Sequence, residues 1–190
     1  MSKFGNIIII SGPSGSGKTT LYQKLLASPK FKGKLVKSIS VTTRPRRAGE
    51  VHGRDYIFVT REMFLYKRRR HHFLEWQKVF NNYYGTPQKS VQDLLRAGKN
   101  VLLCIDVKGA KVVCRKFPKA LTIFIKTPSL AALKKRLLAR GSEMKSVVDL
   151  RLATAREELK EAKHYKHIVV NNDLKTAFNK LNHIIINGIS

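Results

Sequence analysis

A glycine-rich turn carrying one lysine and two hydroxyl side chains stands near the start of the chain. Residues Gly12 to Thr19, GPSGSGKT, fit the spacing G-x-x-x-x-G-K-[ST] and follow four isoleucines. Glycines let the backbone wrap an oxyanion with its N–H groups inward, and a helix that begins there adds positive potential. The pattern predicts a nucleoside triphosphate site, in which Lys18 contacts the β- and γ-phosphates and Thr19 ligates Mg²⁺. A flexible turn would not require those two residues. The predicted triphosphate-binding residues are Gly12, Pro13, Ser14, Gly15, Ser16, Gly17, Lys18, Thr19 and Thr20.

A second candidate anion site lies in the segment from Ser38 to Tyr56. Arg44, Arg46 and Arg47 fall within four residues, and Pro45 disfavours a helix there. A stiff loop with several guanidinium groups suits forked hydrogen bonds to a phosphate. A solvated basic loop is the alternative that these residues leave open.

A carboxylate in the next segment could recognise a base. Glu75 lies in FLEWQKVFNNYYGTP, with Tyr84 and Thr86 shortly after it. A buried carboxylate accepts hydrogen bonds from a base that offers an N1–H and an exocyclic amine on one edge. Guanine offers both groups and adenine does not, so the segment favours guanine.

Composition limits the classes of protein that the chain can be. It has 190 residues, 43% of them hydrophobic, which fits one sizeable domain. No apolar run is long enough for a membrane span, and no export signal is visible, so we expect a soluble protein with no membrane partner. Cys104 and Cys114 do not form a disulfide framework, which favours the cytoplasm; we expect both to be buried. The net charge of +26 predicts weak, non-specific attraction to polyanions.

Short apolar runs alternate with amphipathic stretches, which predicts an α/β fold whose mostly parallel central sheet is covered by helices. The expected strands are Asn6–Ser11, Leu35–Ser40, Asn100–Asp106, Ala120–Lys126 and His167–Asn171. The expected helices begin at Lys18, Gln88, Gly109, Ser129 and Leu174. Residues 41–87 suggest an inserted antiparallel lobe, with strand-like pieces at Asp55–Thr60 and Phe73–Val79. Residues 130–163 predict two helices broken near Gly141 that could move as a unit.

Several motifs, in order, resemble one known family. They are GPSGSGKTT, SVTTRPRRAGEVHGRDYIF, FLEW, NYYGTP, IDVKGA, KKRLLARG and VVNNDL, and they extend over nearly the whole chain. This combination is similar to the guanylate kinases, which are P-loop kinases that transfer the γ-phosphate of ATP to GMP. The resemblance implies a single domain over residues 1–190 with a P-loop core, a GMP lobe at about 41–87 and a helical lid at about 130–163. It also implies that ATP, bound with Mg²⁺, is the phosphate donor and that GMP, together with dGMP, is the acceptor.

The resemblance also implies a role for each matching residue. Arg44, Arg47, Tyr56 and Tyr84 would hold the GMP phosphate, and Glu50 would orient the arginines. Ser40, Glu75, Gly85 and Thr86 would surround guanine, Asp106 would lie on the GMP side, and Asn171 on the adenine side. Arg136, Arg140 and Arg151 would reach from the lid to the transferring phosphate and, with Lys18 and Arg44, form the catalytic set.

The chain departs from the family pattern at a few positions. Cys104 stands where the family usually has the first carboxylate of D-I-D, and a thiol cannot replace a carboxylate that organises magnesium-bound water. Lys108, Thr127 and Asn172 also differ from the common residues. None of these changes touches the P-loop or the arginine pair, so we expect an active enzyme.

Three alternatives compete with this prediction. A related P-loop kinase could use another phosphate acceptor, but Tyr56, Glu75 and Tyr84 favour GMP. Guanylate-kinase-like binding modules of scaffold proteins lack the P-loop lysine, whereas Lys18 is present. Nucleic-acid binding could use the basic run at residues 67–72, KRRRHH, on a helix after Glu62. The sequence shows no aromatic stacking platform interleaved with that run, so a solvated helix face is the simpler interpretation. The oligomeric state stays open.

Overall fold

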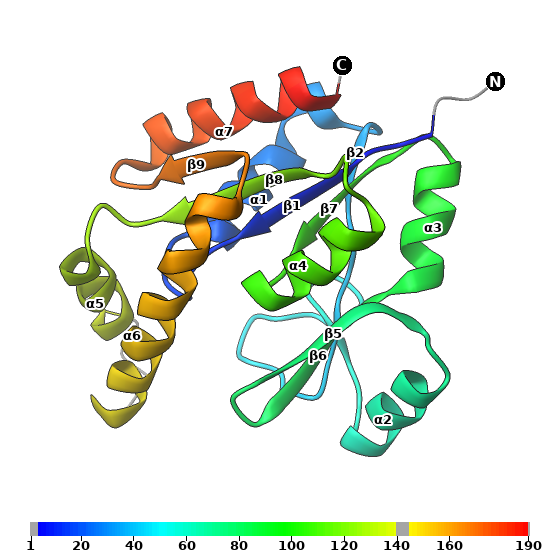
Figure 1. Cartoon of the computed structure of the whole chain (residues 1–190), viewed down its shortest axis with the longest axis horizontal. Helices are drawn as coiled ribbons and strands as arrows, with labels where there is room; N and C mark the ends of the chain where they lie inside the picture. Colours follow the sequence, from blue (N-terminus) through cyan, green and yellow to red (C-terminus); the bar gives the residue numbers. More distant parts are fainter. Residues whose placement is uncertain (1–3, 140–144, 190) are drawn as a thin grey trace. The chain divides into compact units, whose positions relative to one another are not determined.

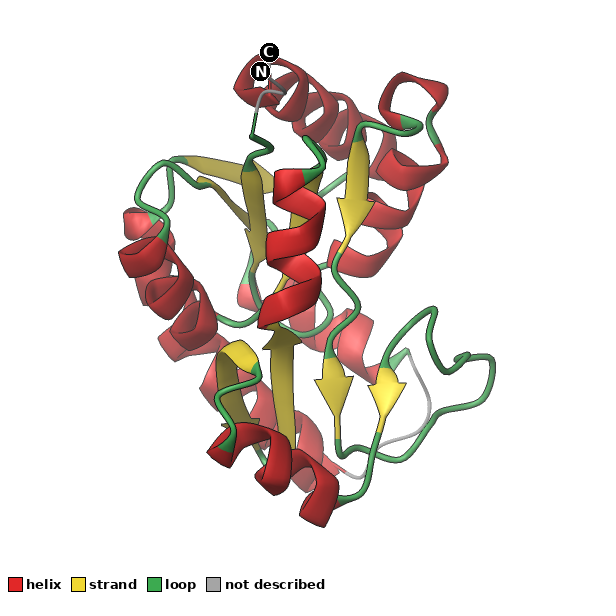
Figure 2. Ribbon diagram, turned by 90° about the vertical axis from the view of Figure 1, so that its right-hand side faces the viewer, coloured by secondary structure: helices red, strands yellow, loops and turns green. Residues whose placement is uncertain are grey.

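The computed structural model describes residues 4–139 and 145–189. The chain divides into two compact units, each made of several segments. The first contains residues 1–7, 33–103 and 108–119, and the second contains residues 8–32, 104–107 and 120–190. Helices and strands alternate along most of the chain, as the sequence predicts (Figure 2). That the whole chain acts as one domain stays a prediction.

The second unit contains a parallel sheet covered by helices. β1 pairs with β8, and β8 pairs with β9, both in parallel register. Every residue of β1 is buried, as is typical of a parallel strand that is covered on both faces. Its elements are β1 (Ile7–Ser11), α1 (Lys18–Ala27), the 3₁₀ turn η1 (Pro29–Phe31), β8 (Leu121–Lys126), α5 (Leu130–Leu138), α6 (Lys145–Lys160), η2 (Glu161–His164), β9 (His167–Val170) and α7 (Leu174–Ile189).

Two helical features of this unit agree with the sequence. α7 contacts α1 and β9, and it buries Ala177, Leu181, Ile184 and Ile185 on one face (Figure 1). Its N-terminus is capped by Asp173, whose carboxylate accepts a hydrogen bond from the Thr176 N–H at 2.8 Å. α5 and α6 pack together through an apolar cluster of their own, so the expected helical hairpin is present. The break predicted near Gly141 lies outside the described residues.

The first unit carries a parallel strand pair and a separate four-stranded sheet. β2 pairs with β7 in parallel register. The second sheet has the order β4-β3-β6-β5. Its β3–β6 and β6–β5 pairs are antiparallel, as predicted, but β3 and β4 are parallel, which the sequence did not indicate. The elements are β2 (Leu35–Lys37), β3 (Val41–Thr42), β4 (Ile57–Phe58), α2 (Arg61–Arg69), β5 (Phe73–Val79), β6 (Asn82–Pro87), α3 (Gln88–Arg96), β7 (Asn100–Cys104) and α4 (Val107–Lys116).

The fold prediction was right in class and imprecise at some boundaries. The α/β fold with a parallel central sheet is confirmed, and the predicted starts of four helices agree with the structure within one residue. The strands that begin at Leu35 and Asn100 end at Lys37 and Cys104, sooner than expected. The helix expected from Gly109 begins at Val107 instead. Both cysteines are half-buried rather than buried. Among the described residues, no helix has the length and apolarity that a membrane span requires.

Candidate active site

The glycine-rich loop connects β1 to α1 in the second unit, which is the strand–loop–helix context that its motif requires. Gly12, Gly15 and Gly17 all have positive φ angles, of 139°, 89° and 92°. Residues with a side chain rarely adopt such positive φ angles, so the loop conformation depends on glycine at these positions. Gly17 is the N-cap of α1, and the helix N-terminus therefore begins directly where a phosphate would be bound.

Lys18 points back toward its own loop. Its Nζ donates hydrogen bonds to the Gly12 carbonyl at 2.6 Å and to the Pro13 carbonyl at 2.8 Å. The charged group is thus held over the loop, where the sequence places it. Thr19 and Thr20 are exposed in the first turn of α1, so the Thr19 hydroxyl is accessible to a metal ion.

Side chains from the α5–α6 hairpin and from the end of β9 hold the loop from outside. Arg151 donates to the Ser14 hydroxyl at 3.0 Å, and Arg136 donates to the backbone carbonyl of Asn171 at 2.8 Å. The buried Asn171 amide in turn donates to the Ser16 carbonyl at 2.8 Å. The second unit therefore brings two predicted lid arginines and Asn171 together with the P-loop. Arg140 lies outside the described residues.

A half-buried carboxylate adds to this group of charges. Burial raises the pKa of Glu158 to about 7; the charge on Lys18 acts against this shift, and the charge on Asp106 adds to it. Asp106 directly follows Ile105, whose backbone is hydrogen-bonded to the end of β1. The Ile105 N–H donates to the Ile10 carbonyl, and the Ser11 hydroxyl donates to the Ile105 carbonyl. Glu158 thus interacts electrostatically with both the P-loop lysine and Asp106.

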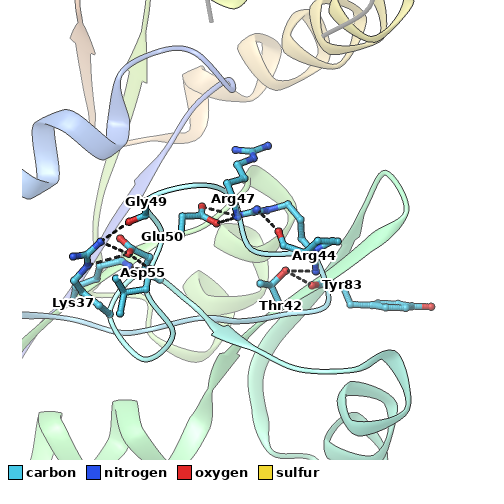
Figure 3. A network of polar contacts seen from close by, with 11 residues as sticks. Lys37, Thr42, Arg44, Arg47, Gly49, Glu50, Asp55 and Tyr83 are labelled. Atoms are coloured by element: carbon cyan, nitrogen blue, oxygen red, sulfur yellow. Dashed lines mark hydrogen bonds and ion pairs between the residues drawn. The ribbon is translucent and has the colours of Figure 1, made fainter. Parts of the chain in front are cut away.

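The arginine loop of the first unit is organised by one carboxylate (Figure 3). Glu50 accepts a hydrogen bond from the Arg44 guanidinium at 2.7 Å through one oxygen and from the Arg47 backbone N–H at 2.9 Å through the other. Burial alone would raise the pKa of Glu50, but these two bonds outweigh it and the pKa is lowered. Burial likewise opposes the charge of Arg44, yet its bond to Glu50 leaves its pKa raised. Both groups therefore stay ionised and fixed.

Aromatic rings form the wall beside this arginine. The Arg44 guanidinium lies 5.5 Å from the Tyr56 ring centre and 5.9 Å from that of Phe58. Tyr84 packs edge-on against Tyr56 at 6.1 Å. Lys37, at the end of β2, lies 5.6 Å from the Tyr56 ring. Two cations and two phenols therefore gather on one side of the lobe.

The predicted base-reading carboxylate is buried beside a hydroxyl. Glu75 is 6% exposed and Thr86 is fully buried, and the Thr86 hydroxyl donates to a Glu75 oxygen at 2.5 Å. In the sheet register Glu75 is paired with Thr86, and Tyr84 with Thr42, so these side chains share one face of the sheet. Gly85 belongs to the other face, because a side chain there would meet the Phe73 ring at 2.8 Å. Its expected place beside guanine is therefore as backbone only. Ser40 is half-buried, directly before β3.

Known proteins of one family are similar to this chain over nearly its whole length. The family model described as guanylate kinase matches residues 4–187. The chain belongs to the guanylate kinase family. A guanylate kinase of Syntrophomonas wolfei is 44% identical over 186 residues, which cover 98% of this chain and 94% of that protein. A guanylate kinase of Nitratidesulfovibrio vulgaris is 43% identical over 178 residues, covering 93% of this chain and 84% of that protein.

Solved structures support the same family fold. The crystal structure of guanylate kinase from Anaplasma phagocytophilum matches with a TM-score of 0.80 and 33% identity, covering 98% of this chain and 87% of that one. The SH3-kinase fragment of tight junction protein 3 matches with a TM-score of 0.54 at 14% identity, covering 97% of this chain and 57% of that one, which shows likeness of fold alone.

Some residues that lie near the predicted site were not found from the sequence. Glu158 and its neighbour Glu157 read as the polar side of an amphipathic helix, and no local pattern separates the half-buried carboxylate from the exposed one. Lys37 and Phe58 read as ordinary strand residues, although both contact or approach the Arg44–Tyr56 group. Pairing of β2 and β4 with distant strands decides their positions. Asp106, predicted on the GMP side, belongs to the second unit with the P-loop, and its role toward GMP stays a prediction.

The first unit also contains a cavity of about 350 Å³. The residues that line it include Val41, Ile57, Phe73, Lys67 and Lys89. Val41 and Ile57 are register partners and pack in the apolar cluster with Phe73, on the sheet face opposite Glu75 and Thr86. The cavity is therefore separate from the predicted guanine site.

Gly12→Ala should unfold or strongly destabilise the protein. A Cβ there would lie 2.0 Å from the Ile125 carbonyl oxygen, in addition to adopting a positive φ. We expect Gly12→Ala to lower the free energy of unfolding by about 2 kcal/mol or more beyond the decrease in Gly33→Ala. Gly33 also has a positive φ, but a Cβ added to it would meet nothing within 4 Å, so the difference isolates the clash. Urea unfolding of both variants measures it, and equal losses would contradict the packing described for the loop.

Glu158 should make stability depend on pH. Because its folded pKa of about 7 is above its ordinary value of 4.5, the folded state holds a proton that the unfolded state releases between these values. Folding stability should therefore fall as pH rises through this window. We expect Glu158→Gln to be more stable than the native protein at about pH 8 by about 2 kcal/mol, with the difference vanishing below about pH 4. Urea unfolding across this range tests it. The exposed neighbour provides the control variant, Glu157→Gln, and a gain that does not change with pH would contradict the assignment.

Proposed function

We propose that this guanylate kinase family member phosphorylates GMP with ATP, giving GDP and ADP. The donor would bind the loop between β1 and α1, and the acceptor would bind the arginine and aromatic face of the lobe. The observation that carries the proposal is the pairing of a phosphate-type cage, Arg44 held by Glu50, with the buried Glu75–Thr86 pair in the same lobe. Membership of the guanylate kinase family, over residues 4–187, supports the same activity.

The donor site would act through charge. The loop N–H groups and the N-terminus of α1 suit the β- and γ-phosphates, and Lys18 would exchange its two loop carbonyls for phosphate oxygens. Arg151, which bonds Ser14, is near enough to the loop to move onto the γ-phosphate, and Arg136 and Arg140 would follow. Because Glu158 is largely protonated below pH 7, it adds little repulsion toward the triphosphate.

Mg²⁺ would enter with the nucleotide. No three His, Cys, Asp or Glu side chains gather to hold a metal in the part of the chain that the structure describes. The exposed Thr19 hydroxyl at the start of α1 supplies one neutral oxygen, which fits a hard cation that also takes phosphate and water ligands. When bound, Mg²⁺ would neutralise charge that develops on the β- and γ-phosphates. Thr19 would hold it at the loop.

The acceptor site would bind and select GMP. Arg44, Arg47, Tyr56 and Tyr84 would donate hydrogen bonds to its phosphate, with Glu50 keeping the arginines in place. Glu75 would accept from the guanine N1–H and amine, while Thr86 and Ser40 complete the polar edge. The reacting phosphate oxygen already carries negative charge near pH 7, because the second pKa of a phosphate monoester is about 6. No general base is then needed, and positioning accounts for catalysis.

A substrate panel tests the proposal. Release of ADP from MgATP is measured with GMP, dGMP, AMP, UMP, CMP and dTMP in turn. We expect turnover with GMP and dGMP, and a kcat/KM for AMP lower by about 10⁴, since adenine leaves the Glu75 acceptor unmatched. Equal rates with AMP and GMP would refute the assigned acceptor. A protein that binds GMP without releasing ADP would instead indicate a binding module.

A further inference from the structure

Basic and aromatic side chains interleave on the lobe, at the flank of α2 and the adjoining face of β5. The Arg68 guanidinium lies 4.8 Å from the Trp76 ring centre, and Arg61 lies 5.7 Å from that of Tyr83. The Trp76 and Tyr83 rings are 6.2 Å apart. Lys78 is two residues beyond Trp76 on β5 and is paired with Tyr83, so it shares their face. Tyr83 itself is buried. We call the other four residues, Arg61, Arg68, Trp76 and Lys78, the Trp76 surface.

A second pair extends the basic area along α2. Arg70 lies 5.5 Å from the Tyr66 ring centre, and Tyr66 is 47% exposed. Residues 61–92 contain seven lysines and arginines but two acids, of which Glu75 is buried on the opposite sheet face. The linear sequence shows no aromatic platform interleaved with the basic run, because Trp76 lies on a different element from Arg68. β5 and α2 are brought together only by folding, which places the Trp76 ring beside Arg68.

The chemistry of this surface fits single-stranded nucleic acid. An exposed indole offers a stacking face to any unpaired base, and guanidinium planes stack on bases as well as pairing with phosphates. Trp76 remains 38% exposed although Arg68 lies over it, so ring surface is available. A duplex hides its bases, and a simple polyanion has none, so neither would use the ring. We propose that the Trp76 surface binds single-stranded RNA or DNA by base stacking on Trp76 and phosphate contacts to Arg61, Arg68 and Lys78.

This site is distinct from the GMP face of the same lobe. Trp76 is paired with Gly85 and Lys78 with Tyr83, whereas Glu75 is paired with Thr86 and Gln77 with Tyr84. Neighbouring residues on a strand point to opposite faces, so the Trp76 surface and the guanine-reading residues lie on opposite sides of the sheet. A nucleic acid strand and GMP should therefore bind without competing.

Trp76 is the single tryptophan of the chain, so its fluorescence reports contact directly. The full-length protein is titrated with a single-stranded oligouridylate 12-mer, the matching oligothymidylate, a duplex of equal length and inorganic polyphosphate. We expect both single strands to quench Trp76 fluorescence with a Kd of about 1–100 µM at moderate salt, with or without saturating GMP. The two single strands distinguish RNA from DNA through the 2′-hydroxyl. Quenching that GMP abolishes, or equal quenching by polyphosphate, would overturn the proposal.

Variants test the two kinds of contact separately. Trp76→Leu keeps an apolar side chain and should weaken single-strand binding, followed by anisotropy of labelled RNA, about fivefold or more. Arg61→Gln with Arg68→Gln should weaken it about tenfold and lower the salt slope by about two, while GMP phosphorylation is unchanged. The matched control is Lys134→Gln with Lys180→Gln, two exposed lysines of the other unit. An equal loss in this control would show attraction by net charge alone and refute the site. If Trp76→Leu does not fold, the arginine pair still decides.

Discussion

Lys18→Ala should abolish measurable GDP formation, a loss of about 10³-fold or more in kcat, while the protein stays folded. The reason is the transition state: the developing charge on the β- and γ-phosphates would lose a cation held at the loop. In the structure the same Nζ bonds the Gly12 and Pro13 carbonyls, so some loss of stability, about 1–2 kcal/mol, should accompany the loss of activity. Single-turnover assays with MgATP and GMP measure the first effect, and thermal unfolding measures the second.

The matched control for this change is Lys24→Ala. Lys24 is an exposed lysine of the same helix, α1, and lies 5.9 Å from the Phe178 ring. Its removal changes the net charge equally but should leave turnover within about twofold, because exposed cation–π pairs contribute little. Phosphoryl transfer retained in Lys18→Ala would count against the donor site at this loop, and similar losses in both variants would show a general charge effect.

Glu75→Gln should lower kcat/KM for GMP by about 10²–10⁴ and leave the KM for ATP nearly unchanged. The amide keeps the size of the side chain but replaces one acceptor oxygen with a donor, which faces the donors of guanine. The Thr86 hydroxyl can still bond the remaining oxygen, so the fold should survive. Preference for GMP over AMP should therefore collapse, since the site would no longer reject adenine through an unmatched carboxylate.

The control variant for this change is Glu62→Gln. It alters an exposed carboxylate of the same unit, in the first turn of α2. That variant should keep its GMP preference. Kinetics with GMP and AMP at saturating MgATP decide between the outcomes. An unchanged GMP-to-AMP ratio in Glu75→Gln would remove this residue from guanine recognition, even if the enzyme proved active.

Local patterns predicted much of the fold. The β1–loop–α1 unit was predictable because its strand, glycines and helix start are adjacent in the chain, and α7 because its apolar residues recur on one face. Where strands end, and the parallel pairing of β3 with β4, depends on partners that are distant in sequence. The strand propensities of individual residues cannot show which distant strand will be the partner.

The candidate site shows the same limit. Glu75 could be singled out as a buried carboxylate because it stands within an apolar strand, but its bond to Thr86 follows from the β5–β6 register. The elevated pKa of Glu158 arises from burial beside Lys18 and Asp106, which are distant in sequence. The contact between Arg68 and the Trp76 ring likewise forms only because the chain folds β5 back beside α2. Contacts of this kind appear only when the chain is folded.

The fit between Gly17 and Asn171 constrains how this protein can diverge. A methyl group on Gly17 would lie 2.2 Å from the Asn171 amide nitrogen, the same nitrogen that bonds the Ser16 carbonyl. Any side chain on residue 17 is therefore incompatible with the present position of the Asn171 amide. A change at Gly17 should therefore displace Asn171 and break its hydrogen bond to the loop, so position 17 should remain glycine for as long as the loop keeps this form.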